Sequence, residues 1–140
     1  MKPLVLRRCD ALHAVFRWGV LPGVLAGCVL HAYTCFFVPE GGPDVFTSGL
    51  FMLSILPYLA CVIVGLRHSR GPLMAVCAIL PILLLDILAF HEAFITPSTS
   101  TSSLVLLVVP VINLGVLLLG FLVGWIAATF ICRKSRTASR

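Results

Sequence analysis

Four long apolar segments, separated by short polar stretches, occupy most of the chain. They run approximately over residues 17–38, 45–66, 72–96 and 104–132. A helix needs about 20 apolar residues to cross the hydrocarbon core of a bilayer, and every segment meets that length. The pattern predicts an all-α fold, an integral membrane four-helix bundle that forms one transmembrane domain over residues 1–140, with a basic tail at 133–140.

The composition agrees with a membrane protein. Only 11% of the 140 residues are charged, and the mean hydropathy is +1.12. A water-soluble globule needs more polar surface than this, so we expect the lipid bilayer to be the main solvent. The formal net charge is +5, but the basic residues flank the apolar segments and form no aromatic-interleaved patch. We therefore expect no nucleic-acid partner.

The basic residues also predict an orientation. All ten lie before the first segment or at its start, between the second and third, or after the fourth: Lys2, Arg7, Arg8, Arg17, Arg67, Arg70, Arg133, Lys134, Arg136 and Arg140. Four crossings place all of these positions on one side of the membrane. The positive-inside rule then predicts that both termini are cytoplasmic. The short loops favour a bacterial cytoplasmic membrane.

Each predicted helix has a proline in its interior, at Pro22, Pro57, Pro81 or Pro110. A proline inside a helix removes one backbone hydrogen bond and frees the carbonyl four residues earlier. We expect four kinked helices.

Small residues recur at helical spacing and predict where the helices pack. Gly19, Gly23 and Gly27 follow one another in the first segment, and Gly120 and Gly124 form a GxxxG pair in the fourth. Small residues let the backbones of two membrane helices approach closely. These glycines are our predicted packing positions.

Each helix also carries one strongly polar side chain on its small-residue face, namely His31, Tyr58, Asp86 or Asn113. The four lie at similar depths, so inward-facing seams would bring them together in the core. A lone carboxylate at mid-membrane is costly, and Asp86 should be protonated, paired or hydrated. His31 is its natural cationic partner. The cluster has two interpretations, a set of interhelical hydrogen bonds that holds the bundle together or a proton site.

Other polar groups predict less. His91 and Glu92 lie near the outer end of the third helix, where they are either hydrated interfacial residues or a relay to Asp86. His31 and His91 suggest a haem b interpretation, in which they would be the axial ligands. They differ in helical phase, however, and the chain has no second histidine pair for the two-haem arrangement of many membrane cytochromes. We expect no cofactor. The six cysteines form no CxxC pair, which predicts no metal site and argues against thiol redox chemistry.

One motif suggests processing. Leu25-Ala26-Gly27-Cys28 matches the lipobox pattern of bacterial lipoproteins. Arg17 shortens the apolar stretch before it, and residues 29–38 stay apolar after it, so we expect an ordinary crossing.

No catalytic constellation is present, and we expect a non-enzymatic protein. The leading hypothesis is a small multi-pass membrane protein that acts as an accessory subunit or packing partner in a membrane complex, bound to other membrane subunits or to itself. The alternative is a proton-coupled small carrier or channel that uses Asp86 and His31.

Overall fold

The computed structural model describes the backbone of residues 14, 16–37, 44–95 and 105–137, and the side chains of 14, 18–37, 44–95 and 105–131. The elements are a π-helical turn η1 (Phe16–Val20) that leads into α2 (Leu21–Phe36), then α3 (Val45–Arg67), α4 (Gly71–Phe90) with a terminal π-helical turn η2 (His91–Ile95), and α5 (Val105–Thr137). The predicted all-α fold of four packed helices is confirmed.

All four helices are long and apolar enough to cross a membrane: Trp18–Phe36, Val45–Arg67, Gly71–Ile95 and Val105–Ile131. These spans indicate a small multi-pass membrane protein in contact with lipid. The fourth helix differs from its prediction, because α5 continues to Thr137 and includes most of the expected tail. No glycine or proline interrupts residues 125–137, so nothing in the sequence ends the helix earlier. The flanks at 1–13, the connections at 38–43 and 96–104, and residues 138–140 lie outside the described residues.

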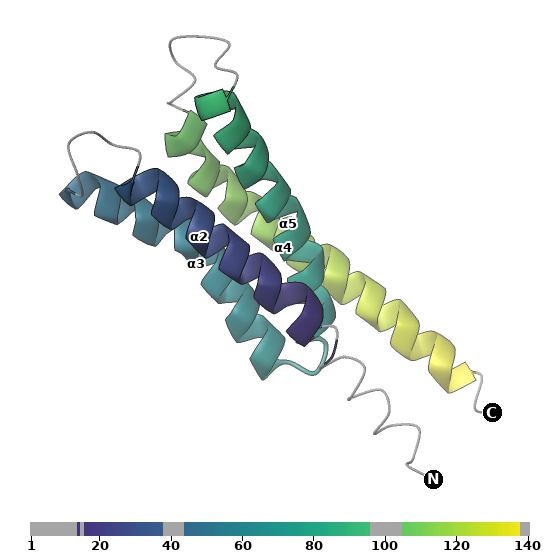
Figure 1. The fold of residues 1–140 in the computed structure, drawn as a ribbon. Coiled ribbons are helices and arrows are strands. Elements are labelled where there is room, and N and C mark those ends of the chain that lie inside the picture. Colours follow the sequence, from purple (N-terminus) through teal and green to yellow (C-terminus); the bar gives the residue numbers. More distant parts are fainter. Residues whose placement is uncertain (1–13, 15, 38–43, 96–104, 138–140) are drawn as a thin grey trace.

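The helices form two antiparallel hairpins, α2 with α3 and α4 with α5 (Figure 1). Helix α4 is central and contacts each of the other three. The start of η1 and the end of α5 lie at the same end of the bundle. We call that end, which includes the α3–α4 turn at residues 68–70, the terminal face. The opposite end, where residues 38–43 and 96–104 connect the helices, is the loop face.

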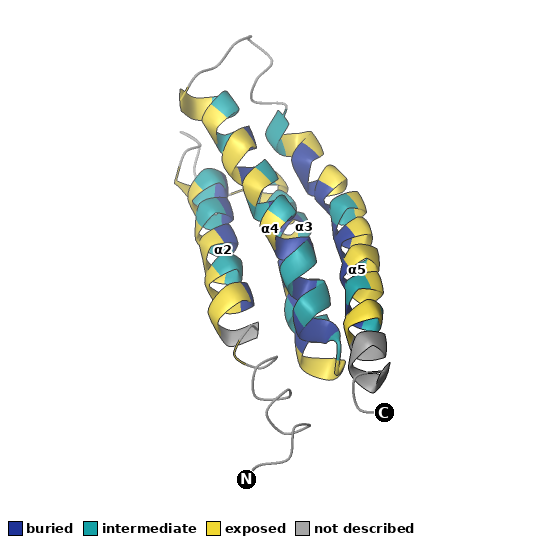
Figure 2. Cartoon of the chain, turned by 90° about the vertical axis from the view of Figure 1, so that its right-hand side faces the viewer, coloured by how far each residue is buried: buried dark blue, intermediate teal, exposed yellow. Residues whose placement is uncertain are grey.

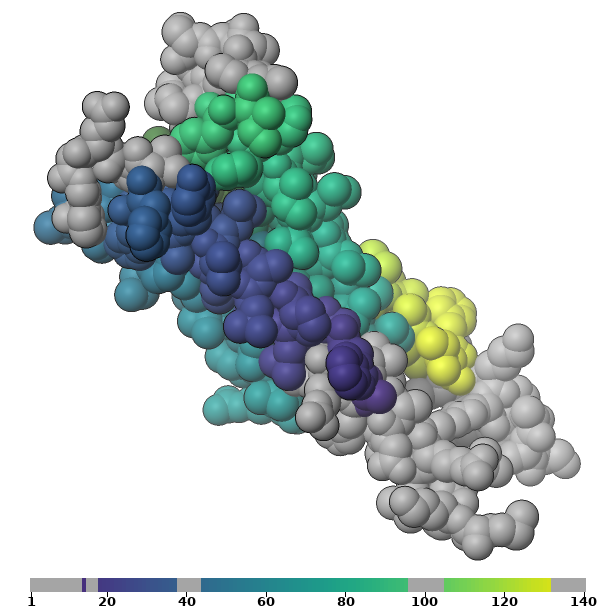
Figure 3. All heavy atoms as spheres, in the orientation of Figure 1, coloured from purple at the N-terminus to yellow at the C-terminus, as the bar shows by residue number. Residues whose placement is uncertain are grey.

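The two hairpins are packed together along the terminal-face half, where side chains of α2 lie directly against those of α4 (Figure 3). Toward the loop face α3 and α5 separate and leave an apolar groove lined by Val45, Phe46, Gly49, Leu50, Leu53, Leu107, Val108 and Val111. The bundle is therefore closed at one end and more open at the other.

Each helix has buried residues on one side and exposed residues on the other (Figure 2), and many of the exposed residues are large and apolar. The main hydrophobic core lies in the terminal-face half and consists of Val20, Tyr58, Cys61, Ala75, Ala78, Ile79, Ile82 and Leu117. The outward residues, such as Leu25, Leu56 and Leu118, are more than half or about half exposed. In a bilayer these faces contact acyl chains.

Three of the predicted packing glycines lie at close helix contacts. A methyl group on Gly27 would overlap the ring of Tyr58, one on Gly120 would overlap Ala78, and one on Gly124 would overlap the backbone of Met74. Glycine at these positions lets α5 approach the backbone of α4 and leaves room for Tyr58 beside α2. Gly23 is half-buried beside Ile79.

The predicted packing position Gly19 lies in the turn η1. The residue is exposed, but a methyl group on it would meet the side chain of Val76 in α4 at 3.4 Å, an ordinary van der Waals distance. Its neighbour Val20 is fully buried. Gly19 therefore faces α4 at the edge of the contact, where the approach is not close enough to require glycine.

The four predicted prolines lie inside helical segments. Pro57, Pro81 and Pro110 lie inside α3, α4 and α5. Pro22 is the second residue of α2, and α2 continues from η1 without a break, because Val20 at the junction has α-helical dihedral angles. Its missing N–H therefore leaves a carbonyl of η1 without that donor.

Asp44 fixes the start of α3 at the loop face. The Thr47 backbone N–H donates to Asp44 Oδ1 at 2.7 Å, and the Asp44 backbone N–H donates to Thr47 Oγ1 at 2.9 Å. These hydrogen bonds from Thr47 lower the pKa of the Asp44 carboxyl below its usual value. Asp44 is thus a charged N-cap at the point where the chain enters the membrane-spanning segment.

The close α4–α5 contact predicts that Gly120→Ala destabilises the bundle by about 1–3 kcal/mol, because the added methyl group forces two backbones apart. Gly115→Ala is the matched control on the same helix, where a methyl group meets nothing within 4 Å. Unfolding in detergent by a denaturant measures both. Equal stability of the two variants would contradict the packing described here.

Candidate functional site

One polar side chain from each helix meets in the core: His31 from α2, Tyr58 from α3, Asp86 from α4 and Asn113 from α5. Their exposed fractions are 8%, 0%, 3% and 0%. The structure therefore brings together all four residues of the predicted polar cluster. None of them faces lipid.

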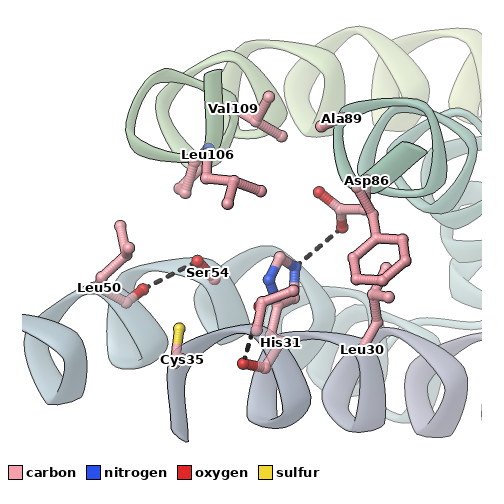
Figure 4. Close-up of a pocket in the computed structure, with 12 residues that line it drawn as sticks. Leu30, His31, Cys35, Leu50, Ser54, Asp86, Ala89, Leu106 and Val109 are labelled. Carbon is pink, nitrogen blue, oxygen red and sulfur yellow. Dashed lines mark hydrogen bonds and ion pairs between the residues drawn. The ribbon is translucent and has the colours of Figure 1, made fainter. Parts of the chain in front are cut away.

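Asp86 is the common partner of the other three. His31 Nε2 lies 3.0 Å from Asp86 Oδ2, and the Tyr58 hydroxyl donates to the same oxygen. Asn113 Nδ2 donates to Asp86 Oδ1 at 2.7 Å. Figure 4 shows His31 and Asp86 pointing toward each other across the space between the hairpins. The carboxylate thus links α4 to every other helix.

The surrounding helices hold the aromatic groups in place. The Tyr58 ring lies against Gly27, where any larger residue would displace it. The rings of His31 and Tyr58 pack edge to face, with centroids 5.9 Å apart. Hydrogen bonds to the carboxylate therefore come from side chains whose positions are already restricted by packing.

The set of donors suits an ionised carboxylate. The Tyr58 hydroxyl and the Asn113 amide both donate, and a protonated His31 adds a third donor and the neutralising charge. An aspartate at mid-membrane costs about 2.5–3.5 kcal/mol on insertion scales. Interhelical hydrogen bonds in membranes contribute about 0.6 kcal/mol each on average and about 1.7 kcal/mol at most, so three average bonds offset part of that cost and three of the strongest kind offset all of it.

The same geometry accepts a second arrangement of the proton. If the proton moves from His31 Nε2 to Asp86 Oδ2, the carboxyl donates and the imidazole nitrogen accepts across the same 3.0 Å. No hydrogen bond is lost, and two charges become none. The pair can therefore hold one proton in either of two places.

A small cavity lies beside the cluster on the side of the loop face. Its volume is about 40 Å³, and His31 and Asp86 form part of its wall. Ser54 and Thr34 also line it, each one turn from a cluster residue. We did not predict this cavity or the role of these hydroxyls, although the spacings Ser54 to Tyr58 and His31 to Thr34 place them on the same seams.

One polar atom of the cluster is left over. Asn113 Oδ1 is buried and accepts no hydrogen bond from the described side chains and backbone. A buried acceptor without a donor is costly, so this oxygen marks a place for one more hydrogen-bond donor next to Asp86.

The outer pair has a different environment. The turn η2 leaves His91 exposed and Glu92 half-buried, five and six residues beyond Asp86. The relay from Glu92 to Asp86 stays a prediction. The haem b interpretation requires a ring nitrogen of His31 to bind iron. In the structure, Nε2 of His31 lies within hydrogen-bond distance of Asp86 instead.

The described residues contain no group of three or more His, Cys, Asp or Glu side chains that could hold a metal ion. Cys28, Cys35, Cys61 and Cys77 are free thiols. The lipobox residues Leu25–Cys28 lie within the continuous helix α2.

Comparisons of the chain with protein-family models, with curated proteins and with solved structures found no match. The function therefore has to be inferred from the cluster, the cavity beside it and the helices that hold them.

The hydroxyl of Tyr58 predicts a measurable contribution to stability. Tyr58→Phe removes one donor to Asp86 and should lower the free energy of unfolding by about 1–2 kcal/mol. Tyr33→Phe is the control, because Tyr33 is half exposed on the outer face of α2. Unfolding of the two variants in detergent compares them. A Tyr58→Phe variant as stable as Tyr33→Phe would show that this hydrogen bond contributes nothing.

Proposed function

We propose that this chain is a small, non-enzymatic, proton-linked membrane protein, a channel or a carrier, in which Asp86 and His31 hold an exchangeable proton. One observation carries the proposal. A single buried carboxylate is bound by donors from all three other helices, and one of those donors is a histidine 3.0 Å away. Two titratable groups in a water-poor core, able to share one proton, are typical of a functional site.

The volume of the cavity limits the size of the species that can bind beside Asp86. Pockets for organic ligands usually measure about 300–1,000 Å³. The space beside Asp86 is about 40 Å³, which suits a few water molecules. Protons, carried by water, are therefore the species that this site accommodates in the described conformation.

The cluster also offers a way to couple protonation to shape. Asp86 is bound by His31 and Tyr58 of the α2–α3 hairpin and by Asn113 of its own hairpin. A change in its charge alters the attraction between the hairpins at the level where they begin to separate. Protonation would then favour one spacing of the hairpins over another.

The accessory-subunit hypothesis loses part of its motivation. It was based on small-residue ridges, and Gly27, Gly120 and Gly124 pack inside this chain rather than on its outer surface. Binding to other subunits, or to a second copy of the chain, stays a prediction that we place below the proton-linked function. We retain the proposal of a bacterial cytoplasmic membrane with cytoplasmic termini, supported by the distribution of basic residues.

The test is proton flux into vesicles that contain the purified protein. Asp86→Asn keeps the size of the side chain and an oxygen acceptor but removes the titratable group, so flux should fall to the rate of protein-free vesicles. Asp44→Asn is the matched control, because Asp44 lies outside the cluster at the start of α3. Unchanged flux in Asp86→Asn would remove the proposed function.

A further inference from the structure

The cavity beside Asp86 extends in one direction only. Its wall includes Cys35 near the end of α2, Phe90 at the end of α4 and Leu106 at the start of α5. These residues lie within the last turns before the loop face. The residues that line the cavity thus lie at the level of the carboxylate or on its loop-face side, and Figure 4 shows several of them around it.

The polar groups of its wall share one property. The Ser54 hydroxyl donates to the Leu50 carbonyl at 2.8 Å, and the Thr34 hydroxyl donates to the His31 carbonyl at 3.1 Å. The hydrogen of each hydroxyl is therefore used in a bond to the backbone, and only the oxygen lone pairs are left to accept hydrogen bonds from the cavity. With Asp86 beside them, the wall attracts hydrogen-bond donors, and water or hydronium is the donor that fits.

On the terminal-face side of Asp86 the bundle is closely packed with apolar side chains. The next layers toward the terminal face are filled by apolar side chains that are at most 6% exposed: Val20, Cys61, Ala78, Ile79, Ile82 and Leu117. Close-packed apolar layers of this kind offer no hydrogen-bond partners to water. We call these six residues the plug.

We propose that the cavity is a water-filled vestibule through which Asp86 and His31 exchange protons with the loop face alone, while the plug closes the route to the terminal face. The proposal rests on the proposed function and gives it a direction. A vestibule water delivers a proton to the Asp86–His31 pair and takes it back, so that water and hydronium interconvert and no other reactant is needed.

The titratable groups around the carboxylate are few. His31 faces it from α2 and Tyr58 from α3, while α5 contributes the uncharged Asn113. The thiol of Cys35 lines the vestibule, and those of Cys28 and Cys61 lie near Tyr58. Among these groups His31 is the one whose ring nitrogen can accept a proton from water and share it with Asp86 across 3.0 Å, which makes it the entry point for the proton.

The native cysteines allow a direct test. Full-length variants that keep only Cys35 or only Cys61 are reconstituted into vesicles, and silver ion is added to one side. Silver is small and binds thiols, and the remaining free thiol is counted after denaturation. Ser48→Cys marks the loop face and Ser69→Cys marks the terminal face, because both serines are exposed at their ends of the bundle.

Cys35 should react when silver is added from the side on which the Ser48→Cys marker reacts, and Cys61 should react from neither side. Reaction of Cys35 from the side of the Ser69→Cys marker would overturn the proposal. Reaction of Cys35 no faster than that of Cys61 would also overturn it. Either result can be obtained whether or not Asp86→Asn abolishes flux, so failure of the route is distinguishable from failure of the proposed function.

A second variant tests the role of the vestibule in proton movement. Ala89→Leu fills the cavity from its α4 wall and should protect Cys35 from silver and slow proton flux, with Asp86 intact. Ala93→Leu is the matched control one turn further along, outside the lining residues. Flux through Ala89→Leu equal to that through Ala93→Leu would contradict the route.

Discussion

The carboxylate of Asp86 is buried among four apolar helices, and the arrangement of the bundle follows from satisfying its hydrogen bonds. Each neighbouring helix supplies one group, and the three hydrogen bonds together reduce the cost of placing an acid at this depth. Because Asp86 lies on the central helix α4, the same interactions join both hairpins. The features that stabilise the bundle and the features that can bind a proton are therefore the same atoms.

Packing on the two sides of Asp86 is unequal, and this inequality gives the molecule a direction. Toward the terminal face, Gly120 and Gly124 let α5 lie against the backbone of α4, and the space between the hairpins is filled. Toward the loop face the hairpins separate, and the space left over is lined by hydroxyls that accept hydrogen bonds. A symmetric bundle would offer Asp86 no preferred side.

Helical periodicity was sufficient to predict the four helices and the residues of the cluster. The cluster residues could be identified because a strongly polar side chain on the small-residue face of a membrane helix is expected to point into the bundle and not into lipid. They are His31, Tyr58, Asp86 and Asn113. Periodicity did not predict the π-helical turn η1, in which Gly19 is exposed and lies beside Val76 of α4. The local sequence carries no pattern that would have indicated this turn except Pro22, two residues after its end.

The vestibule was beyond prediction for another reason. Its wall is formed by residues of all four helices, and their relative placement depends on contacts between segments far apart in the chain. Ser54 and Thr34 carry the appropriate chemistry, but helix periodicity alone does not reveal that the bundle widens beside them. The sequence was therefore enough to predict which polar side chains meet in the core, but not the cavity beside them.

The central claim is that Asp86 changes its protonation state within the folded protein. Difference infrared spectroscopy of the reconstituted protein between acidic and neutral pH tests it directly, through the C=O stretch of the protonated carboxyl group. The account predicts a reversible band that is absent in Asp86→Asn and present in Asp44→Asn. A carboxyl group at position 86 that keeps one protonation state throughout the pH range in which the protein stays folded would contradict it.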